Sequence, residues 1–342
     1  MTRVTLRDVA VHAGVSHQTV SNVLNDHPSI RPHTRERVLA SIRALDYHPN
    51  VAAKALRESR VTILCCAFYG RSTDDIADPY YNLIQSAFIA EATASGYSIT
   101  TAFLNEERPE SFTALRGAFL QGRFAGTVLV GTNFTAERLT DLHRWDIPAI
   151  LFDYAVPDPH FAMVTADYKG GMELLVAHLA ERGLRHLTLV IPTQDKGTTA
   201  RMRLDGFLEA VRARGLRYEI EDGDWMADSG EEAFRRIWAR PERPEAVICG
   251  NDRMAAGALL AARTLGLSVP NDVSITGFDD FEFARYTAPS LTTVHVPHGE
   301  MARSAVRMLI ARIGTSAAQE EASKEDHCFL KTPVTLVVRE SA

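Results

Sequence analysis

The sequence predicts a small all-α unit at the N-terminus followed by a much larger parallel α/β core. In residues 1–48 apolar side chains recur at helical spacing, whereas from residue 61 short apolar runs alternate with amphipathic stretches of helix length. The chain has 342 residues, more than one hydrophobic core usually serves, so we expect several packed units.

The charge is divided unevenly between the two parts. Residues 1–60 hold nine Lys and Arg against five Asp and Glu, a net charge of +4, whereas the rest of the chain carries −10. The overall charge of −6 alone would argue against a nucleic-acid partner. A basic unit on an acidic body, however, is suited to contacting phosphates while the body stays clear of them.

Composition and spacing exclude several other classes. No stretch approaches the ~20 apolar residues that a membrane helix requires, and the first residues lack the features of a secretory signal. The four cysteines show no metal-ligand or redox spacing; they are Cys65, Cys66, Cys249 and Cys328. We therefore expect buried free thiols, a cytoplasmic protein and neither a metal nor another cofactor.

Three helices are expected in the N-terminal unit, residues 1–48. The first helix ends at Gly14. Ser16 caps the second helix, which ends at Asn25–Pro28. Thr34 caps the third helix, which stops before Pro49. Their expected inward-facing residues are Leu6, Val9, Ala10 and Ala13, then Val20, Val23 and Leu24, then Val38, Leu39, Ile42 and Leu45.

The second helix carries polar side chains that we place on or beside its exposed face: His17, Gln18, Thr19, Ser21 and Asn22. Two short helices joined by a glycine turn predict a helix-turn-helix, whose second helix lies in the DNA major groove. Amides and imidazole read base edges, and hydroxyls are suited to phosphates. The alternative is the solvated polar face of an ordinary amphipathic helix.

Three motifs follow one another in the headpiece and the segment after it. They are Thr5-Leu6-x-Asp8-Val9-Ala10, Gly14-Val15-Ser16-x-x-Thr19-Val20-Ser21-x-Val23-Leu24-Asn25 and Tyr47-x-Pro49-Asn50-x-x-Ala53-x-x-Leu56. Together they resemble the signature of the lactose-repressor (LacI/GalR) family, and a looser similarity extends to the C-terminus. The resemblance implies a sequence-specific DNA-binding transcriptional regulator, expected to be a repressor, with a periplasmic-binding-protein-like core.

The resemblance also implies which residues contact DNA. Positions 17, 18 and 22 would make the principal base contacts. Family members often have Arg at the last of these, whereas this chain has Asn22, so the operator sequence stays open. The expected DNA-binding residues are Thr5, Leu6, Ser16, His17, Gln18, Thr19, Ser21, Asn22, Asn25, Asn50, Ala53, Lys54 and Leu56.

Residues 49–60 are expected to form a hinge helix and linker. Isolated helices below ~12–15 residues are marginal in water. By resemblance, this one folds when two chains meet on DNA, and Leu56 then wedges between minor-groove bases. The alternative is a linker helix with Leu56 packed on the core. One headpiece makes few contacts, so we expect a homodimer, or a tetramer built from it, on a near-palindromic double-stranded operator.

The core, residues 61–342, reads as two Rossmann-like subdomains. We place the first at about 61–163 and 292–323 and the second at about 164–291 and 324–342, with Gly314–Asp326 as a polar surface loop. The expected strands are Val61–Phe68, Ser98–Phe103, Thr127–Val130, Ala149–Phe152, Leu187–Ile191, Ala246–Cys249, Val273–Gly277 and Thr335–Val338. The expected helices include Tyr81–Ala94, Lys169–Arg182, Arg201–Arg214 and Arg253–Leu265.

Polar and aromatic residues follow several of these strands, where ligands of parallel α/β folds bind. The candidate effector-binding residues are Tyr80, Tyr81, Asp153, Phe161, Arg203, Trp225, Asn251 and Asp279. The resemblance carries over Arg203, Asn251 and Asp279 as effector contacts and the others less directly. The alternatives are helix caps at Asp252 and Asp280, a structural ion pair at Arg203 and a core position for Tyr81.

Carboxylates, an amide and a guanidinium around an aromatic ring favour a sugar or sugar derivative, which is expected to close the cleft and release the operator. The alternative is a regulator that responds to a purine-type or other non-sugar metabolite. No dinucleotide-binding, P-loop or nucleophile-elbow motif occurs, so an α/β enzyme fused to the headpiece is disfavoured. We expect core or surface roles for His178, His186 and His298.

Overall fold

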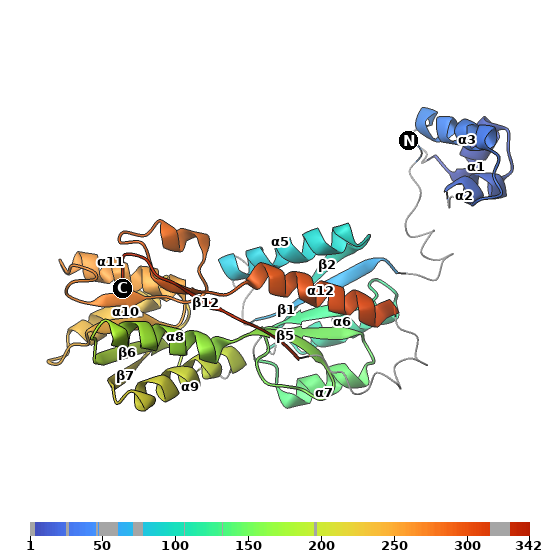
Figure 1. The fold of residues 1–342 in the computed structure, drawn as a ribbon. Helices are drawn as coiled ribbons and strands as arrows, with labels where there is room; N and C mark the ends of the chain where they lie inside the picture. Colours follow the sequence, from blue (N-terminus) through green and yellow to red (C-terminus); the bar gives the residue numbers. More distant parts are fainter. Residues whose placement is uncertain are drawn as a thin grey trace. The chain divides into compact units, whose positions relative to one another are not determined.

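The computed structural model describes residues 4–24, 27–45, 47, 61–70, 78–105, 107–131, 133–194, 197–314 and 329–342. The chain divides into two compact units, Met1–Val61 and Thr62–Ala342 (Figure 1). This division agrees with the composition, because the change from helical spacing to alternating strands and helices falls at the same place in the sequence.

The headpiece contains α1 (Leu6–Ala13), α2 (His17–Leu24) and α3 (Pro32–Ala44). A capping box begins α1: Asp8 N–H donates to the Thr5 hydroxyl, and Thr5 N–H donates to the Asp8 carboxylate. Gly14 takes the left-handed conformation at φ 60° and ends the helix. A small core holds the three helices together; it includes Val9, Val20, Val38 and Tyr47.

Two expectations about the third helix are wrong. It begins at Pro32 rather than after Thr34, because the fixed φ of proline favours the first helical position, and its N-cap residue Arg31 makes no side-chain cap. Leu39 is 38% exposed and does not belong to the inward stripe, although Val38 beside it is fully buried.

The first part of the core is a parallel six-stranded sheet in the order β11-β5-β4-β3-β1-β2. Its strands are β1 (Ile63–Tyr69), β2 (Ser98–Leu104), β3 (Thr127–Val130), β4 (Ala149–Phe152), β5 (Ala162–Ala166) and β11 (Phe329–Thr332). The helices that accompany it are α5 (Pro79–Ala94), α6 (Glu110–Leu120), α7 (Ala136–Arg144) and α12 (His298–Gly314). Strands β3, β4 and β5 are buried along their whole length, as expected for a sheet covered on both faces.

The second part is a parallel four-stranded sheet in the order β7-β6-β8-β9. Its strands are β6 (His186–Ile191), β7 (Arg217–Asp222), β8 (Ala246–Cys249) and β9 (Ser274–Thr276). Its helices are α8 (Tyr168–Glu181), α9 (Thr198–Ala213), α10 (Ala227–Trp238), α11 (Asp252–Thr264) and the short 3₁₀ helix η2 (Glu282–Arg285). An antiparallel pair, β10 (Thr293–His295) with β12 (Thr335–Val337), completes the core.

Strands β5, β7, β10 and β11 lie outside the strands expected from the sequence. Strand β11 pairs with β5 in the six-stranded sheet, whereas the expected division gave residues 324–342 to the second subdomain. Because β5, the strand that β11 pairs with, is distant in sequence, apolar patterning alone does not predict the position of β11 in the sheet. The edge strand β7 has no apolar run, because four of its six residues are charged, so apolar patterning does not predict it.

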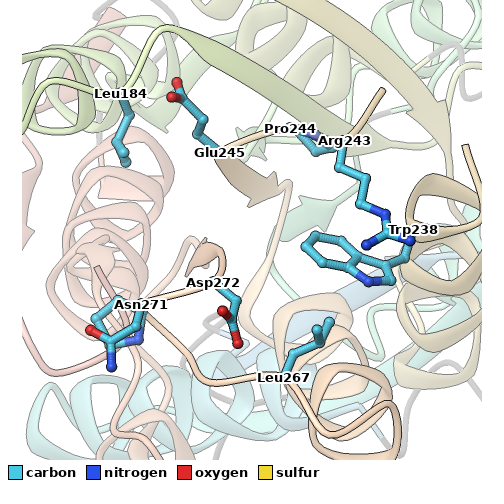
Figure 2. Close-up of a pocket in the computed structure, with 9 residues that line it drawn as sticks. Leu184, Trp238, Arg243, Pro244, Glu245, Leu267, Asn271 and Asp272 are labelled. Carbon is cyan, nitrogen blue, oxygen red and sulfur yellow. The ribbon is translucent and has the colours of Figure 1, made fainter. Parts of the chain in front are cut away.

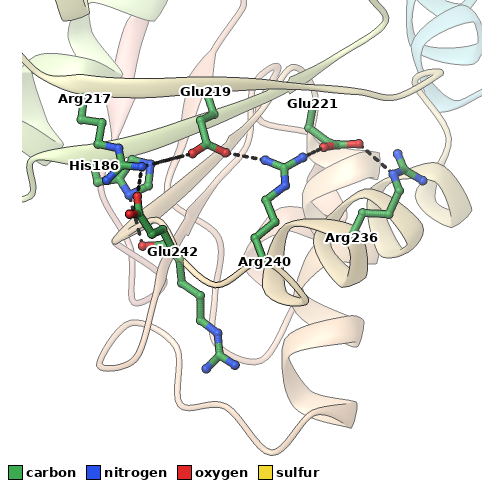
Figure 3. A network of polar contacts seen from close by, with 8 residues as sticks. His186, Arg217, Glu219, Glu221, Arg236, Arg240 and Glu242 are labelled. Atoms are coloured by element: carbon green, nitrogen blue, oxygen red, sulfur yellow. Dashed lines mark hydrogen bonds and ion pairs between the residues drawn. The ribbon is translucent and has the colours of Figure 1, made fainter.

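Those charges on β7 form a network with arginines of α10 and of the turn after it (Figure 3). Glu219 and Glu221 both pair with Arg240, Glu221 also accepts from Arg236 Nε at 2.7 Å, and His186 Nε2 lies 3.3 Å from Glu219. Charged side chains on an outermost strand disfavour pairing with a strand of another molecule. The network therefore disfavours the addition of a further strand at the β7 edge of the sheet.

Candidate DNA-reading helix and effector cleft

Helix α2, the predicted recognition helix, exposes only part of its predicted reading face. His17 and Gln18 are exposed, Thr19 and Asn22 are partly exposed, and Ser21 is only 4% exposed. Ser21 follows Val20 onto the inward side of α2, so it is not accessible in this conformation of the headpiece. The burial of Ser21 differs from its placement on or beside the exposed face.

Two local hydrogen bonds order the side chains of this helix. Gln18 Nε2 donates to Asn22 Oδ1 at 3.0 Å, which is the i,i+4 spacing of one helical face. Ser16 caps α2, because its Oγ accepts from Thr19 N–H at 3.1 Å. Thr5 is exposed and caps α1, and Leu6 is partly buried. The remaining expected DNA contacts lie outside the described residues: Asn25, Asn50, Ala53, Lys54 and Leu56.

In the core, Asp153 is the centre of a buried hydrogen-bond cluster at the end of β4. It is 4% exposed and accepts hydrogen bonds from the hydroxyls of Tyr80, at 2.5 Å, and Tyr168. Burial, reinforced by the negative charge of Asp153, raises the pKa of both tyrosines well above 10. Both phenols therefore remain protonated donors.

Arg203 and Asp279 form a second buried pair beside this cluster. Arg203 Nη2 donates to Asp279 Oδ1 at 3.0 Å, and the two side chains are only 6% and 7% exposed. The guanidinium carbon lies 4.2 Å from the ring centre of Tyr168, 4.6 Å from that of Phe278 and 5.3 Å from that of Trp225. Aromatic faces compensate part of the cost of burying this cation.

A close helix contact positions Arg203 in α9. A Cβ at Gly206, three residues later, would lie 2.7 Å from the backbone oxygen of Lys169 in α8. Only glycine allows this approach of the two helices. The sequence pattern Arg-x-x-Gly thus places the guanidinium next to Tyr168, the first residue of α8.

Asn251 holds Trp225 in place. Its Oδ1 accepts from Met254 N–H at 2.9 Å and so caps α11, and its Nδ2 donates to the Trp225 carbonyl oxygen at 3.0 Å. Trp225 has a positive φ of 75°. Asn251 is 7% exposed, and both ends of its amide are already used within the protein. It acts first as a positioning residue for the indole.

Residues with strained backbone conformations are concentrated around Asp153 and Arg203. Among the described residues, five other than glycine have positive φ: Asp146, Asp153, Trp225, Asp279 and Asp280. All but Asp146 belong to the polar cluster or adjoin it. Residues held in such conformations are concentrated at ligand sites, because the surrounding structure must hold them there.

The remaining expected residues have other surroundings. Tyr81 packs edge-on against Phe68, with ring centres 5.3 Å apart, which agrees with the alternative of a core position. Phe161 is 3% exposed and belongs to the apolar cluster on the side of α6 and α7. Asp252 is fully buried and accepts from Phe281 N–H at 2.8 Å, and burial raises the pKa of its carboxyl group well above 3.8.

Four members of the cluster are not among the residues predicted from the sequence: Tyr168, Phe278, Phe281 and His298. His298 is the first residue of α12 and is 1% exposed, and its Nε2 lies 3.4 Å from Asp279 Oδ1. A signal for Tyr168 was present, because the apolar run of β5 is followed by Asp167, which caps α8. For His298 no local signal exists, since its neighbours come from distant segments.

The two halves of the core are joined at this cluster. Arg253 of α11 pairs with Asp78 at the start of α5, and Ala155 N–H donates to the Thr198 hydroxyl at 2.9 Å. With the Asp279–His298 contact, these bonds link residues around the six-stranded sheet to residues around the four-stranded one. A ligand that changes their spacing would move one half against the other.

A separate pocket of about 510 Å³ lies elsewhere, at the amino ends of the strands in the four-stranded sheet (Figure 2). Glu245 and Asp272 precede β8 and β9, and Arg243 covers the Trp238 ring at 4.8 Å. Ligands of parallel α/β sheets bind beyond the carboxyl ends of the strands. This pocket therefore does not coincide with the cluster around Arg203.

Comparison with known proteins gives the family. Residues 5–50 match the model for bacterial regulatory proteins of the lacI family, and residues 176–342 match a periplasmic binding protein-like domain. The HTH-type transcriptional repressor PurR of Erwinia tasmaniensis is 34% identical over 330 residues, which cover 94% of this chain and 93% of the relative. The PurR of Yersinia enterocolitica is 32% identical and covers 90% of each chain.

The chain belongs to the LacI family. Solved structures agree with this assignment. A lac repressor dimer bound to operator and the anti-inducer ONPF is 26% identical, with a TM-score of 0.86 and 99% of each chain covered. A complex of the regulator CelR with cellobiose is 28% identical, with a TM-score of 0.72, covering 99% of this chain and all of the other.

This LacI-family protein is a DNA-binding transcriptional repressor and not an enzyme. The expected fold, a helix-turn-helix headpiece with a periplasmic-binding-protein-like α/β core, is confirmed. No helix in the described part of the chain has the length and apolar character needed to cross a membrane. Nor do the described residues include a group of three or more His, Cys, Asp or Glu side chains able to hold a metal ion.

Proposed function

We propose that a small effector binds at the cluster around Arg203 and Asp279 and thereby controls the affinity of this repressor for its operator. The observation that carries the proposal is the burial of a guanidinium, two carboxylates and several aromatic rings at the junction of the two halves. Charged groups are seldom buried without a function or a partner. Asp153, Trp225 and Tyr80 complete the site.

The first candidate for the effector is a purine-type heterocycle. The rings of Tyr168, Trp225 and Phe278 surround the guanidinium, and flat heterocycles stack on such faces. Arg203 and Asp279 supply a donor and an acceptor for its edge. The recurrence of PurR among relatives above 30% identity also supports this class, which the sequence analysis held as its alternative.

A sugar or sugar derivative is the second candidate. It was the first choice from the sequence, because carboxylates and an aromatic plate suit hydroxyls and the C–H face of a sugar. The likeness to the CelR–cellobiose complex supports it, as does the likeness to the lac repressor bound to ONPG, at 27% identity.

The proposed mechanism is a rotation of one half of the core against the other when the effector closes the cleft. A coupling free energy of ~1–3 kcal/mol would change operator affinity by about 5- to 150-fold. We propose that the effector releases the operator. The alternative is that the effector is a corepressor, which promotes operator binding. Release and promotion would both use the same contacts between the two halves of the core.

We further propose that the repressor binds a near-palindromic operator as a homodimer in the cytoplasm. Apolar side chains are exposed on both halves of the core, including Leu83 and Ile89 of α5 and Leu260 of α11. Such side chains favour burial against a second subunit. The solved lac repressor binds its operator as a dimer, and a second headpiece raises avidity without new contacts.

The test is a thermal-shift screen of the full-length protein against purine bases and sugars, followed by operator titration with each ligand that binds. The proposal expects at least one ligand to raise the melting temperature and to change operator affinity at least fivefold. A ligand that binds without changing operator affinity would contradict allosteric control. Comparing the two ligand classes decides between a purine-type and a sugar effector.

A further inference from the structure

His298 has a buried imidazole ring in which one nitrogen contacts a carboxylate and the other makes no hydrogen bond to a described residue. Its Nε2 lies 3.4 Å from Asp279 Oδ1, and the side chain is only 1% exposed. A carboxylate paired with Arg203 accepts hydrogen bonds, so Nε2 is the nitrogen that donates. In the neutral imidazole Nδ1 is then an acceptor, and it has no hydrogen-bond partner among the described residues.

The ring of His298 is held in this position by its neighbours. The Tyr80 ring lies perpendicular to it with centres 5.1 Å apart, and the Phe281 ring lies nearly parallel at 6.0 Å. The ring is thus confined between aromatic side chains. Because buried polar atoms normally find a partner, an unpaired nitrogen in a ring fixed in this way requires an explanation.

Arg203 contributes a second unpaired atom to the same cluster. Its Nη2 donates to Asp279, but its Nε, also buried, has no hydrogen-bond partner in the described part of the chain. Both residues contact the same oxygen of Asp279. The cluster therefore offers an acceptor, His298 Nδ1, and a donor, Arg203 Nε–H, on either side of one carboxylate.

We propose that His298 determines effector specificity by accepting, at Nδ1, a hydrogen bond from a hydroxyl or N–H group of the effector. Arg203 Nε–H donates to an oxygen or nitrogen of the same molecule. This inference rests on the proposed effector function of the cleft. The ligand chemistry it requires is a donor together with an acceptor, which the lactam of an oxopurine and the hydroxyls of a sugar both supply.

Two other histidines, His178 and His186, also have a buried ring nitrogen without a hydrogen-bond partner among the described residues, but both lie away from the cluster around Arg203. His186 Nδ1 interacts with the Arg243 carbonyl oxygen at 3.2 Å, whereas its Nε2 makes no hydrogen bond to a described residue and lies 3.3 Å from Glu219 Oε1 in the charge network of β7. His178 lies in the last turn of α8, at the opposite end from Tyr168. Replacing His178 is therefore the matched control.

The test compares His298→Phe and His178→Phe in the full-length protein. Phenylalanine keeps a planar ring and removes the nitrogens, and exchanging an unpaired polar group for an apolar one of similar shape need not destabilise the fold. The probes are hypoxanthine, guanine, cellobiose and galactose. We expect His298→Phe to keep operator binding and to lower, at least tenfold, the affinity for whichever probe the wild type binds. His178→Phe should leave that affinity unchanged.

A second measurement uses singly methylated analogues of that ligand. In the wild type, methylation of the N–H or hydroxyl that meets His298 should weaken binding about tenfold or more, and in His298→Phe the same methylation should have little effect. If His298→Phe binds the parent ligand as tightly as the wild type, the role of His298 is refuted while the proposed function stands. If no purine base or sugar in the thermal-shift screen binds the wild type, the proposed function fails and the role of His298 fails with it.

Discussion

At the scale of single residues, the chemistry of the cleft depends on groups that are costly to bury. The charges of Arg203 and Asp279 offset each other, and the hydroxyls of Tyr80 and Tyr168 donate hydrogen bonds to the carboxylate of Asp153. Removing one partner of such a pair leaves the other charge or acceptor buried and unpaired. Substitutions here should therefore change both stability and ligand response, and matched variants are needed to separate the two effects.

Arg203→Ala should abolish the response to effector while the headpiece keeps its affinity for the operator. The loss of a buried partner for Asp279 should also lower the free energy of unfolding by about 3–5 kcal/mol. Denaturant unfolding and operator titration with and without effector measure the two effects. Arg203→Ala with Asp279→Asn is the control, because it removes the unpaired charge; a normal effector response in Arg203→Ala would refute the site.

Tyr80 and Tyr168 should make the protein lose stability above about pH 10. Burial raises the pKa of both phenols above their unfolded value, so the folded protein binds more protons in that range. Their contribution is present below pH 10 and is lost as the pH rises. Urea unfolding between pH 8 and 11 should show a shallower decline for Tyr168→Phe, whereas Tyr286→Phe, at a residue 72% exposed, should follow the wild type. Equal slopes in both variants would contradict this.

At the scale of elements, the proposed effect of a ligand on operator affinity depends on the hinge predicted at residues 49–60 and on the contacts between helices of the core. Local pattern predicted the existence of α5, α8, α9 and α11 and most buried strands, because their apolar spacing is regular. It also predicted that Asp153, Arg203 and Asp279 come together, since ligands of paired α/β subdomains bind between them, beyond the carboxyl ends of the strands. It did not predict β11 or His298, whose neighbours are set by chain crossings between the two sheets.

Leu56→Ala should leave the fold intact and weaken operator bending and affinity by about tenfold, because inserting a side chain between base pairs is repaid by wider contact with bent DNA. Gel-shift titration and a circular-permutation bending assay measure the change. Leu56→Ile, which keeps the apolar volume, is the control. Unchanged binding by Leu56→Ala would remove the wedge from the proposal and favour a linker packed on the core.

The Arg253–Asp78 pair should favour the arrangement of α11 and α5 that closes the cleft. Arg253→Ala should therefore raise the effector concentration for half-maximal response by up to about fivefold, the equivalent of ~1 kcal/mol. Arg303→Ala is the control, because it removes the surface ion pair with Glu300 instead. Calorimetric titration of the effector measures the shift. An identical response in the two variants would show that the pair does not contribute to closure.

At the scale of the whole molecule, the charge and domain patterns predicted the division of labour. The basic headpiece and the acidic core form separate compact units, as the charge asymmetry indicates. The class of effector could not be predicted in the same way, because a guanidinium, a carboxylate and an aromatic ring serve both sugars and purines. In our proposal that choice depends on the unpaired atoms of the cluster, His298 Nδ1 and Arg203 Nε, which only the folded chain reveals.

We propose that α2 reads a DNA duplex and that the core controls this reading. The most direct measurement is operator selection from random duplex DNA with purified full-length protein, at moderate salt and with competitor DNA, followed by titration with and without effector. We expect a near-palindromic site bound at least ~10³-fold more tightly than competitor DNA, with an effector changing that affinity. No preference for any duplex, with or without small molecules, would contradict it.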